Sequence, residues 1–410
     1  MAEILRPDTD KAVLEALSNA LVEKTPLEIV GGGTKRAYGG PVTSGATRLD
    51  LSALSGITLY EPNELVLGAG AATPMAEIER VLDAADQQLA FEPQDLGFLL
   101  GAASEGATLG GVIAAGLSGP RRIKDGSARD HLLGFHAVSG AAEVFKSGGR
   151  VVKNVTGFDL SKLMAGSFGT LAVMTDVTIK VVPRPEKTRT VLVFGLDDAT
   201  AIAAMTVALG SAFEVSAAAH LPEPMAGRSA VGYVSGAGAS VTAIRVEGFG
   251  PSVASRCNSL KNLLTSFAAV EELHSQNSRQ LWQEIRDVRL LDNKDATQVW
   301  RLSVPPSDGA GVASRIVRDI EGAEMLFDWG GGLVWVAVPS TPDAHVAHVR
   351  GALANVGSGH ATLVRAAEDV RRSVPVFHPG SPGLSALGRR VRETFDPEGI
   401  LNPGRLELKS

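Results

Sequence analysis

Three glycine-rich segments in the first half of the chain carry the residues best suited to chemistry. The first, Gly31-Gly32-Gly33-Thr34-Lys35, directly follows the short apolar run Leu27–Val30. Consecutive backbone N–H groups at the end of a strand can form a concavity that binds the oxygens of a diphosphate. Thr34 would add a hydroxyl donor and Lys35 a positive charge. A flexible turn is the alternative interpretation, because glycine otherwise weakens strands and helices.

Two further segments repeat this composition. Small residues dominate from Gly106 to Gly116, which indicates that another body, either a ligand or a closely packed helix, lies against this backbone. The third segment, 153–170, places polar side chains after a predicted strand, where they could meet a ribityl chain or the edge of a ring. An ordinary capped loop is its alternative. Because such clusters recur within one domain, the sequence favours a ligand.

The composition limits the class of protein. With 410 residues, 44% hydrophobic and 20% charged, the chain is long enough for about two or three domains. A net charge of −6 gives no reason to expect a nucleic acid as partner. The single cysteine, Cys257, excludes an internal disulfide framework, a four-cysteine zinc site and a cysteine-ligated iron–sulfur cluster. No three histidines are spaced as metal ligands, so we expect no metal.

Neither a signal peptide nor a membrane-spanning helix is expected. Residues 1–17 contain no positively charged region ahead of an apolar core. Apolar stretches elsewhere are interrupted before about eighteen residues. We therefore expect a cytoplasmic protein that reaches the inner membrane, if at all, only through partner subunits.

Periodic patterns outline the elements that position these residues. Apolar spacing predicts amphipathic helices at 10–24, 74–89, 281–291 and 383–395, and short apolar runs predict strands at 27–30, 65–67, 298–304 and 333–338. Alternation from Val173 to Val181 predicts another strand, and residues 142–152 a hairpin with its turn at 147–149. Pro183 and Pro185 then break the chain. We predict domains at 1–185 and 186–365, followed by a C-terminal segment, 366–410.

One glycine pattern points elsewhere. Gly68–Thr73 lies between a predicted strand and a predicted helix, where a dinucleotide fingerprint of the Rossmann type would lie. Its last position is threonine, Pro74 follows at once, and Pro93 disfavours a central parallel strand downstream. These departures disfavour a nicotinamide cofactor.

Four motifs together resemble one protein family. GGGTKRAYG, GATLGG, KNVTGFDLSKLMAGSFGTLAVMTDVTIKV and FDPEGILNPGR are similar to motifs of the FAD-linked oxidases of the vanillyl-alcohol oxidase type. The resemblance covers residues 1–183 most closely and 383–405 less closely. It implies an α+β fold: a p-cresol methylhydroxylase (PCMH)-type FAD-binding domain of two α+β subdomains, an α+β cap domain, and a C-terminal tail that returns to the first domain.

The resemblance also implies roles by position. It implies that Gly31, Gly32, Gly33, Thr34 and Lys35 contact the diphosphate of FAD, that Gly106, Thr108, Gly110, Gly111, Gly119 and Arg129 form the flavin bed, that Lys153, Asn154, Gly157 and Asp159 belong to a further cofactor motif, and that Asn402 lies near the ring. Many relatives tether FAD through His or Cys near the glycine loops. Residues 29–45 contain neither, so we expect non-covalent FAD.

Catalytic residues are harder to assign. Oxidation of a 2-hydroxy acid needs a cation for the carboxylate and a base for the hydroxyl proton. Arg301 is the candidate cation, because strand alternation separates it from the apolar side chains of Trp300 and Leu302. His360 and His378 are the candidate bases. Structural roles for all three, including a solvated strand face for Arg301, are the alternatives.

The resemblance suggests a function within a complex. Within the family, the chain looks most like the smaller FAD-binding subunit of glycolate oxidases, which implies electron relay through FAD beside a catalytic FAD subunit and an iron–sulfur subunit during oxidation of glycolate to glyoxylate. The cap motifs GDGN and EHGIG of hydroxy-acid-oxidising relatives are missing here. That departure leaves catalysis on this chain open. A stand-alone oxidase of a 2-hydroxy acid and a flavin-binding scaffold without redox activity are the alternatives.

Overall fold

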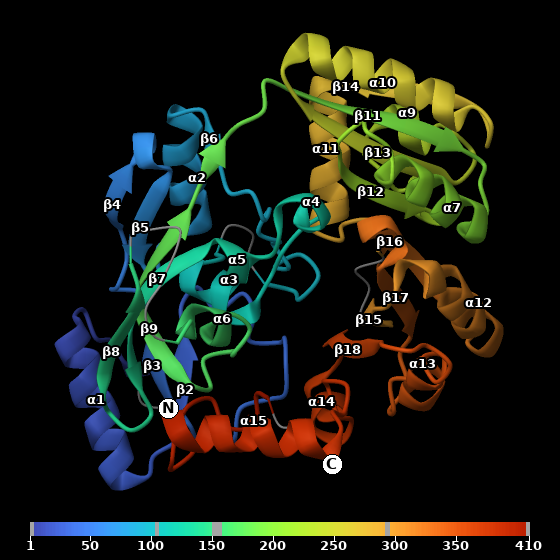
Figure 1. Ribbon diagram of the computed structural model, residues 1–410. Coiled ribbons are helices and arrows are strands. Elements are labelled where there is room, and N and C mark those ends of the chain that lie inside the picture. Colours follow the sequence, from blue (N-terminus) through green and yellow to red (C-terminus); the bar gives the residue numbers. More distant parts are fainter. Residues whose placement is uncertain (1–3, 103–105, 150–157, 292–295, 407–410) are drawn as a thin grey trace. The chain divides into compact units, whose positions relative to one another are not determined.

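The computed structural model describes residues 4–102, 106–149, 158–291 and 296–406. It divides into two compact units that interleave along the sequence (Figure 1). The first unit comprises Met1–Ser118, Gly126–Arg184 and Phe377–Ser410, and the second comprises Gly119–Asp125 and Pro185–Val376. The short segment Gly119–Asp125 therefore belongs to the second unit, although the residues on both sides of it in sequence belong to the first. The sequence patterns do not predict this assignment.

The first unit contains two main sheets. A three-stranded parallel sheet has the order β1 (Ile4–Leu5), β3 (Thr47–Asp50), β2 (Leu27–Val30). A five-stranded antiparallel sheet has the order β4 (Ile57–Glu61), β5 (Val66–Gly70), β9 (Ala172–Lys180), β7 (Leu132–Ser139), β8 (Val144–Gly148). Strands β6 (Gln87–Gln88) and β10 (Val182–Pro183) pair separately. Because β5 is antiparallel to both neighbours, Gly68–Thr73 does not belong to a parallel Rossmann unit.

Helices of various lengths complete the first unit. They are α1 (Asp10–Glu23), α2 (Met75–Ala84), α3 (Leu109–Ala115), α5 (Ala128–His131), α6 (Leu160–Met164) and α15 (Pro382–Phe395), with a 3-10 turn at Pro62–Glu64. Helix α1 shows why they form where they do. The Thr9 side chain accepts a hydrogen bond from the N–H of Ala12, and Val13, Leu17 and Ala20 are buried on one face.

The second unit is built on one eight-stranded antiparallel sheet. Its order is β14 (Val270–His274), β11 (Lys187–Phe194), β13 (Val241–Gly248), β12 (Val215–Leu221), β16 (Glu324–Asp328), β17 (Leu333–Pro339), β15 (Thr297–Ser303), β18 (His360–Arg365). The helices are α4 (Arg122–Asp125), α7 (Asp198–Leu209), α8 (Glu223–Ala226), α9 (Gly232–Ser235), α10 (Gly250–Leu264), α11 (Ser275–Arg286), α12 (Gly309–Asp319), α13 (Val346–Gly351) and α14 (Glu368–Ser373), with 3-10 turns at Pro306–Asp308 and Trp329–Gly331.

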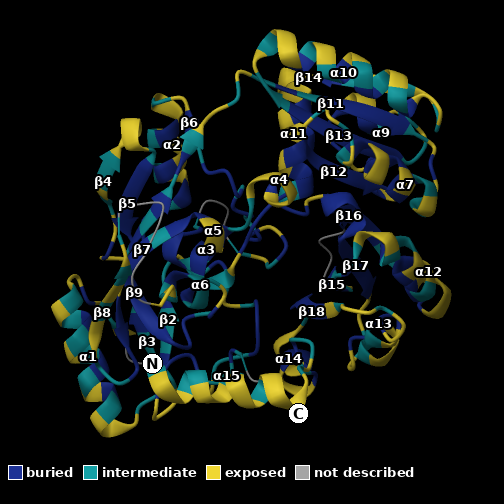
Figure 2. Ribbon diagram, in the orientation of Figure 1, coloured by how far each residue is buried: buried dark blue, intermediate teal, exposed yellow. Residues whose placement is uncertain are grey.

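Each unit has its core along its sheets (Figure 2). All seven residues of β12 are buried, as are the first six of β17, so these strands are covered on both faces. Helix α15 differs, because none of its residues is buried and Leu384 and Leu387 are 61% and 50% exposed. Among the described residues, no helix combines the length and the apolar character needed to cross a membrane.

Three sequence-predicted elements differ clearly from the structure. Helix α11 runs from Ser275 to Arg286 and not over 281–291. The hairpin of β7 and β8 turns at residues 140–143 and not at 147–149, because Ala142 adopts the left-handed conformation (φ 56°) and Ser147 pairs with Phe135 inside the ladder. Helix α2 ends at Ala84 and not at 89. Asp86 is left-handed there (φ 51°), which turns the chain into β6 while Leu89 remains buried.

Candidate functional site

The first two glycine segments meet in the first unit. A Cβ atom on Gly32 would overlap the carbonyl oxygen of Gly106, and one on Gly31 would lie 2.7 Å from Thr108 Oγ1. Side chains at these positions would push the segments after β2 and before α3 apart. Gly32 is therefore needed for the close approach of two backbones, and Gly31 leaves room for the Thr108 side chain, whatever ligand lies beside them.

Two cavities lie beside this contact. The first, of about 100 Å³, is lined by residues 29–36 together with side chains from α3 and the C-terminal tail. The second, of about 90 Å³, is lined largely by small and apolar residues such as Ala71, Ala72 and Ala172. The two share Gly31, Thr108 and other lining residues, so they form one hollow with a polar and an apolar part. We call the polar part the glycine cradle; its polar and glycine lining consists of Gly31, Gly32, Gly33, Thr34, Lys35, Arg36, Thr108, Gly111, Asn402 and Arg405.

Lys35 is the most informative residue of the glycine cradle. Its Nζ donates a hydrogen bond to Thr34 Oγ1 at 3.2 Å, and no ion pair of Lys35 is found among the described residues. Burial lowers the pKa of Lys35 to about 8, while the charge of Asp95 acts in the opposite direction. An anion bound in the cradle would stabilise this charge. A half-buried cation, a buried hydroxyl and glycine backbone together fit the diphosphate of a dinucleotide.

Asn402 joins the tail to the glycine cradle. Its Oδ1 accepts a hydrogen bond from the N–H of Ile29 at 2.8 Å, and its Nδ2 donates to the carbonyl oxygen of Phe168 at 2.9 Å. Leu401 also forms a parallel bridge with Leu27 at the edge of β2. The side chain predicted to lie near the ring lines both cavities, and its hydrogen bonds to the other described residues run to backbone atoms. Asn402 therefore shapes the hollow by fixing β2 against residues 168–169.

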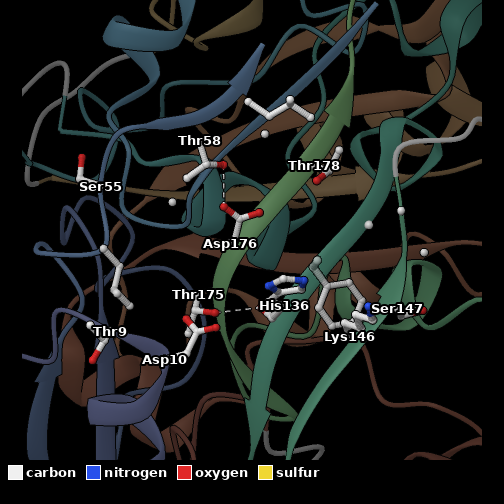
Figure 3. A pocket seen from close by; sticks show the side chains of 18 of the residues that line it. Thr9, Asp10, Ser55, Thr58, His136, Lys146, Ser147, Thr175, Asp176 and Thr178 are labelled. Carbon is white, nitrogen blue, oxygen red and sulfur yellow. Dashed lines mark hydrogen bonds between the residues drawn. The ribbon is translucent and has the colours of Figure 1, made fainter. Parts of the chain in front are cut away.

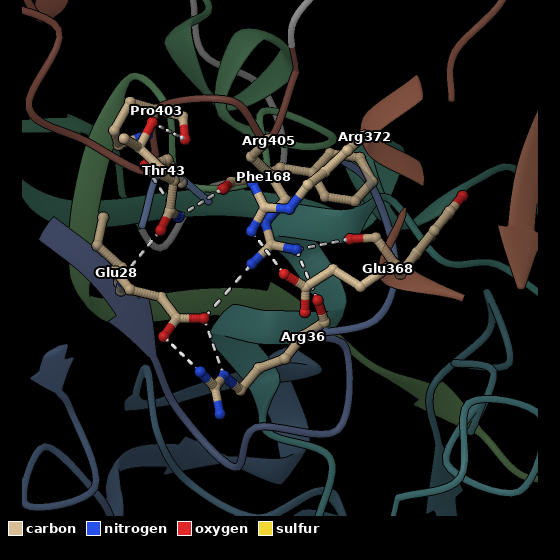
Figure 4. A network of polar contacts seen from close by, with 12 residues as sticks. Glu28, Arg36, Thr43, Phe168, Glu368, Arg372, Pro403 and Arg405 are labelled. Atoms are coloured by element: carbon tan, nitrogen blue, oxygen red, sulfur yellow. Dashed lines mark hydrogen bonds and ion pairs between the residues drawn. The ribbon is translucent and has the colours of Figure 1, made fainter. Parts of the chain in front are cut away.

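Arg405, three residues after Asn402, attaches the same tail to the loop that follows β2 (Figure 4). Its Nη1 donates to the carbonyl oxygens of Arg36 and Tyr38, at 2.7 and 3.1 Å. Its Nη2 lies 3.6 Å from Glu28, which also receives two hydrogen bonds from Arg36. Arg405 is 7% exposed, so this network closes the outer side of the loop that follows β2. The FDPEGILNPGR motif contained Arg405, although only Asn402 was predicted from it.

The remaining predicted cofactor residues are dispersed. Gly33 is left-handed (φ 73°), as its loop requires, and a Cβ on Gly110 would lie 2.8 Å from the carbonyl oxygen of Ala71, which points to packing. Arg129 and Asp159 are exposed in α5 and before α6. Gly119 belongs to the second unit, where its carbonyl oxygen accepts from Trp329 Nε1 at 3.1 Å. Lys153, Asn154 and Gly157 lie outside the described residues.

Two of the three catalytic candidates share one face of the second unit's sheet. Arg301 on β15 pairs directly with Thr362 on β18, and Ser303 pairs with His360. Directly paired residues in an antiparallel ladder point to the same face, so the Arg301 and His360 side chains are diagonal neighbours there. A carboxylate binder and a base could act together from these positions. His378 belongs to the first unit.

A larger cavity, of about 620 Å³, lies on the five-stranded sheet of the first unit (Figure 3). Asp176, His136 and Lys146 follow one another across β9, β7 and β8, and Thr58 Oγ1 donates to Asp176 at 2.8 Å. Burial raises the pKa of Asp176. None of the residues predicted for the cofactor or for catalysis lines this cavity, so the glycine cradle remains the candidate cofactor site.

Comparison with known proteins agrees with this geometry. Residues 1–148 match the family described as FAD binding domain. The chain is 36% identical over 400 residues to glycolate oxidase subunit GlcE of Escherichia coli (strain K12), and the alignment covers 97% of each protein. It is 30% identical over 182 residues to a D-lactate dehydrogenase of Archaeoglobus fulgidus, which covers 44% of this chain and 39% of that protein.

A solved structure identifies the fold. The crystal structure of p-cresol methylhydroxylase with substrate bound has a TM-score of 0.70 at 13% identity, covering 98% of this chain and 88% of that one. The fold is therefore that of the PCMH-type flavoproteins, as the sequence motifs predicted. Given the nearly full-length similarity to GlcE, the chain belongs to the family of FAD-linked oxidases that includes that subunit. The predictions of FAD as cofactor and of an FAD-dependent oxidoreductase are confirmed.

Proposed function

We propose that this chain is the FAD-binding subunit of a glycolate oxidase complex, which oxidises glycolate to glyoxylate. The observation that carries the proposal is the similarity to GlcE over 97% of both proteins, which extends through the second unit and the tail. The similarity to the D-lactate dehydrogenase covers 44% of this chain. Because a partial match includes less of the chain, it is weaker support for a shared substrate.

The glycine cradle would hold the diphosphate of FAD. Lys35 would supply the charge, Thr34 a hydroxyl donor, and the glycine backbone N–H groups the remaining hydrogen bonds. When bound, FAD supplies an acceptor for two electrons. Cys257 is fully buried in α10, and burial raises its pKa to about 11, which disfavours the thiolate needed for a cysteinyl link. These features support non-covalent FAD.

Arg301 and His360 are the residues that would act on a 2-hydroxy acid, if this chain does so itself. Arg301 would hold the carboxylate through its paired N–H donors. His360 would accept the hydroxyl proton at a ring nitrogen, and it is placed diagonally from Arg301 on the same sheet face. The other proposed subunits of the complex are a catalytic FAD subunit and an iron–sulfur subunit. We place the complex in the cytoplasm, with any contact to the inner membrane made by those partners.

Spectroscopy of the purified chain, alone and with its partners, tests this function. Acid precipitation should release flavin into solution, and the FAD spectrum should be bleached by glycolate only after the partner subunits are added. An iron determination on the co-purified complex should detect the iron–sulfur subunit. A chain that never takes up FAD under reconstitution would contradict the proposal.

One alternative retains a specific observation in its favour. Arg301 and His360 share one face of the sheet, which suits a stand-alone oxidase or dehydrogenase of a 2-hydroxy acid. Bleaching of the flavin by glycolate or another 2-hydroxy acid, without partner subunits, would support this alternative. A colourless chain that still assembles with the partners would instead identify a scaffold without redox activity.

A further inference from the structure

Trp329 occupies an unusual position in the second unit. It adopts the left-handed backbone conformation (φ 54°), which is strained for an aromatic residue. The Asp328 side chain holds the strained residue by accepting its backbone N–H at 2.7 Å. The indole is 6% exposed, and its Nε1 donates to the carbonyl oxygen of Gly119 at 3.1 Å. Trp329 is therefore held at two points, its backbone N–H and its indole N–H.

The segment Gly119–Asp125 is fixed against the same unit. Arg121 is 7% exposed and donates two hydrogen bonds to the Glu247 carboxylate, at 3.1 and 2.8 Å. A two-pronged bond of this kind sets orientation as well as position. Together with the bond from Trp329 to Gly119, it holds the segment at two points. The next residue, Arg122, is thereby held beside the indole of Trp329.

Two guanidinium groups approach this one ring. Arg122 lies 4.3 Å and Arg301 5.1 Å from the ring centre of Trp329, measured from each guanidinium carbon. Arg301 also lies 6.0 Å from the ring centre of Trp335, its directly paired neighbour on β17. Both distances to Trp329 lie within the range of about 6 Å that is usual for cation–π contacts. The two guanidinium carbons are consequently within about 10 Å of each other. Stacking engages the flat face of a guanidinium, while hydrogen bonds use its edge.

We propose that Arg122 and Arg301, both oriented by Trp329, form the carboxylate-binding subsite for the 2-hydroxy acid. The inference rests on the proposed function, which supplies the substrate class. It adds Arg122 and Trp329, which no motif indicated, to the predicted candidate Arg301. Like charges brought to one ring favour an anion between or beside them. His360, diagonal to Arg301, stands where a base for the neighbouring hydroxyl would be needed.

Titration of the FAD-loaded full chain with oxalate tests the subsite. Oxalate presents carboxylates but cannot donate a hydride, so binding is measured without turnover. Calorimetry should give an affinity that falls about tenfold or more in Arg122→Gln and in Arg301→Gln, because each loses a charge-assisted hydrogen bond. Tryptophan emission should respond to oxalate in the parent, and this response should largely disappear in Trp329→Phe. Arg318→Gln, which removes an exposed arginine paired with Asp319, should bind oxalate like the parent.

Further variants and measurements distinguish failure of the subsite from failure of the proposed function. Arg122→Lys keeps the charge, loses the planar fork and should show an intermediate affinity. Unchanged oxalate affinity in Arg122→Gln, or tighter binding of inorganic phosphate than of oxalate, would overturn the subsite. Flavin content is determined on each sample by absorbance. If the arginine substitutions leave oxalate binding unchanged while the flavin content is full, the subsite is contradicted and the proposal that the chain binds FAD is not. If oxalate binds through both arginines in a chain that cannot take up FAD, the proposed function is contradicted and the subsite is not.

Discussion

The side-chain oxygen of Asn402 accepts a hydrogen bond from the backbone N–H of Ile29 at 2.8 Å, although the two residues are 373 positions apart. The same side chain donates to the carbonyl oxygen of Phe168. One amide in the tail thus connects the strand that leads into the glycine cradle with the loop that closes it. The tail is a structural part of the cofactor site.

We predict that Asn402→Ala lowers the free energy of unfolding by about 1–2 kcal/mol, because it leaves two backbone groups without their bonds. The variant should also lose FAD more readily, since Ile29 and Phe168 line both cavities. Urea unfolding and flavin content after dialysis measure the two effects. Asn262→Ala, at an exposed position of α10, is the matched control and should change stability by less than about 0.5 kcal/mol. Equal effects of the two substitutions would contradict the role of Asn402.

Lys35 makes the stability of the FAD-free chain depend on pH. Its pKa is about 8 in the folded chain, against 10.5 as the ordinary value. Between these values the unfolded chain binds more protons, so stability must rise with pH. The expected gain from pH 7 to pH 10 is on the order of 2 kcal/mol, and Lys35→Met should lack it. Urea unfolding of both proteins across this range measures the difference, and subtracting the two removes the titration of Cys257 and the tyrosines.

Bound FAD should suppress this dependence. A diphosphate beside Lys35 favours the charged amine and raises its pKa towards the ordinary range. FAD binding at pH 9 should therefore take up a proton, which calorimetry in buffers of different ionisation enthalpy detects. Proton uptake that is identical in the parent and in Lys35→Met would show that another group is responsible.

Local patterns predicted most elements of the first unit. The alternation from Val173 to Val181 gave β9, and the apolar spacing with Thr9 ahead of it gave α1, because both depend on neighbouring residues. The predictions of the hairpin turn at 147–149 and of the end of α2 at 89 were wrong. Left-handed conformations at Ala142 and Asp86 turn the chain there, and apolar periodicity does not mark them.

The site was predictable only in part for the same reason. The motif after β2 identified Lys35 because three glycines and a threonine precede it in sequence. Nothing local marks Gly119–Asp125 as part of the second unit, where Arg121 meets Glu247 and Arg122 meets Trp329. These contacts join residues more than a hundred positions apart, so periodicity and motif spacing do not reveal them.

Gly32 should tolerate no side chain. A Cβ there would overlap the carbonyl oxygen of Gly106, and backbone cannot move aside as a flexible side chain can. Gly32→Ala should reduce both flavin content and melting temperature. Gly383→Ala, at the first turn of α15 with no atom within 4 Å of the added Cβ, should be neutral or slightly stabilising. Flavin absorbance and thermal unfolding measure both variants. A Gly32→Ala protein with parental stability and full flavin would mean that the two glycine segments do not touch in solution.

The pair formed by Arg121 and Glu247 should contribute strongly to the stability of the second unit. Both side chains are largely buried, at 7% and 9% exposure, and removal of one partner leaves a buried charge poorly compensated. Arg245 and Thr188 still contact Glu247, so Arg121→Ala should cost about 3 kcal/mol, at the lower end of the usual range. Arg318→Ala removes an exposed pair with Asp319 and should destabilise the chain far less. Thermal unfolding compares the two directly, and equal losses would mean that Gly119–Asp125 is not held by this pair. In that case the position of Arg122 beside Trp329 would not depend on Arg121, and the oxalate affinity of Arg121→Ala would remain parental.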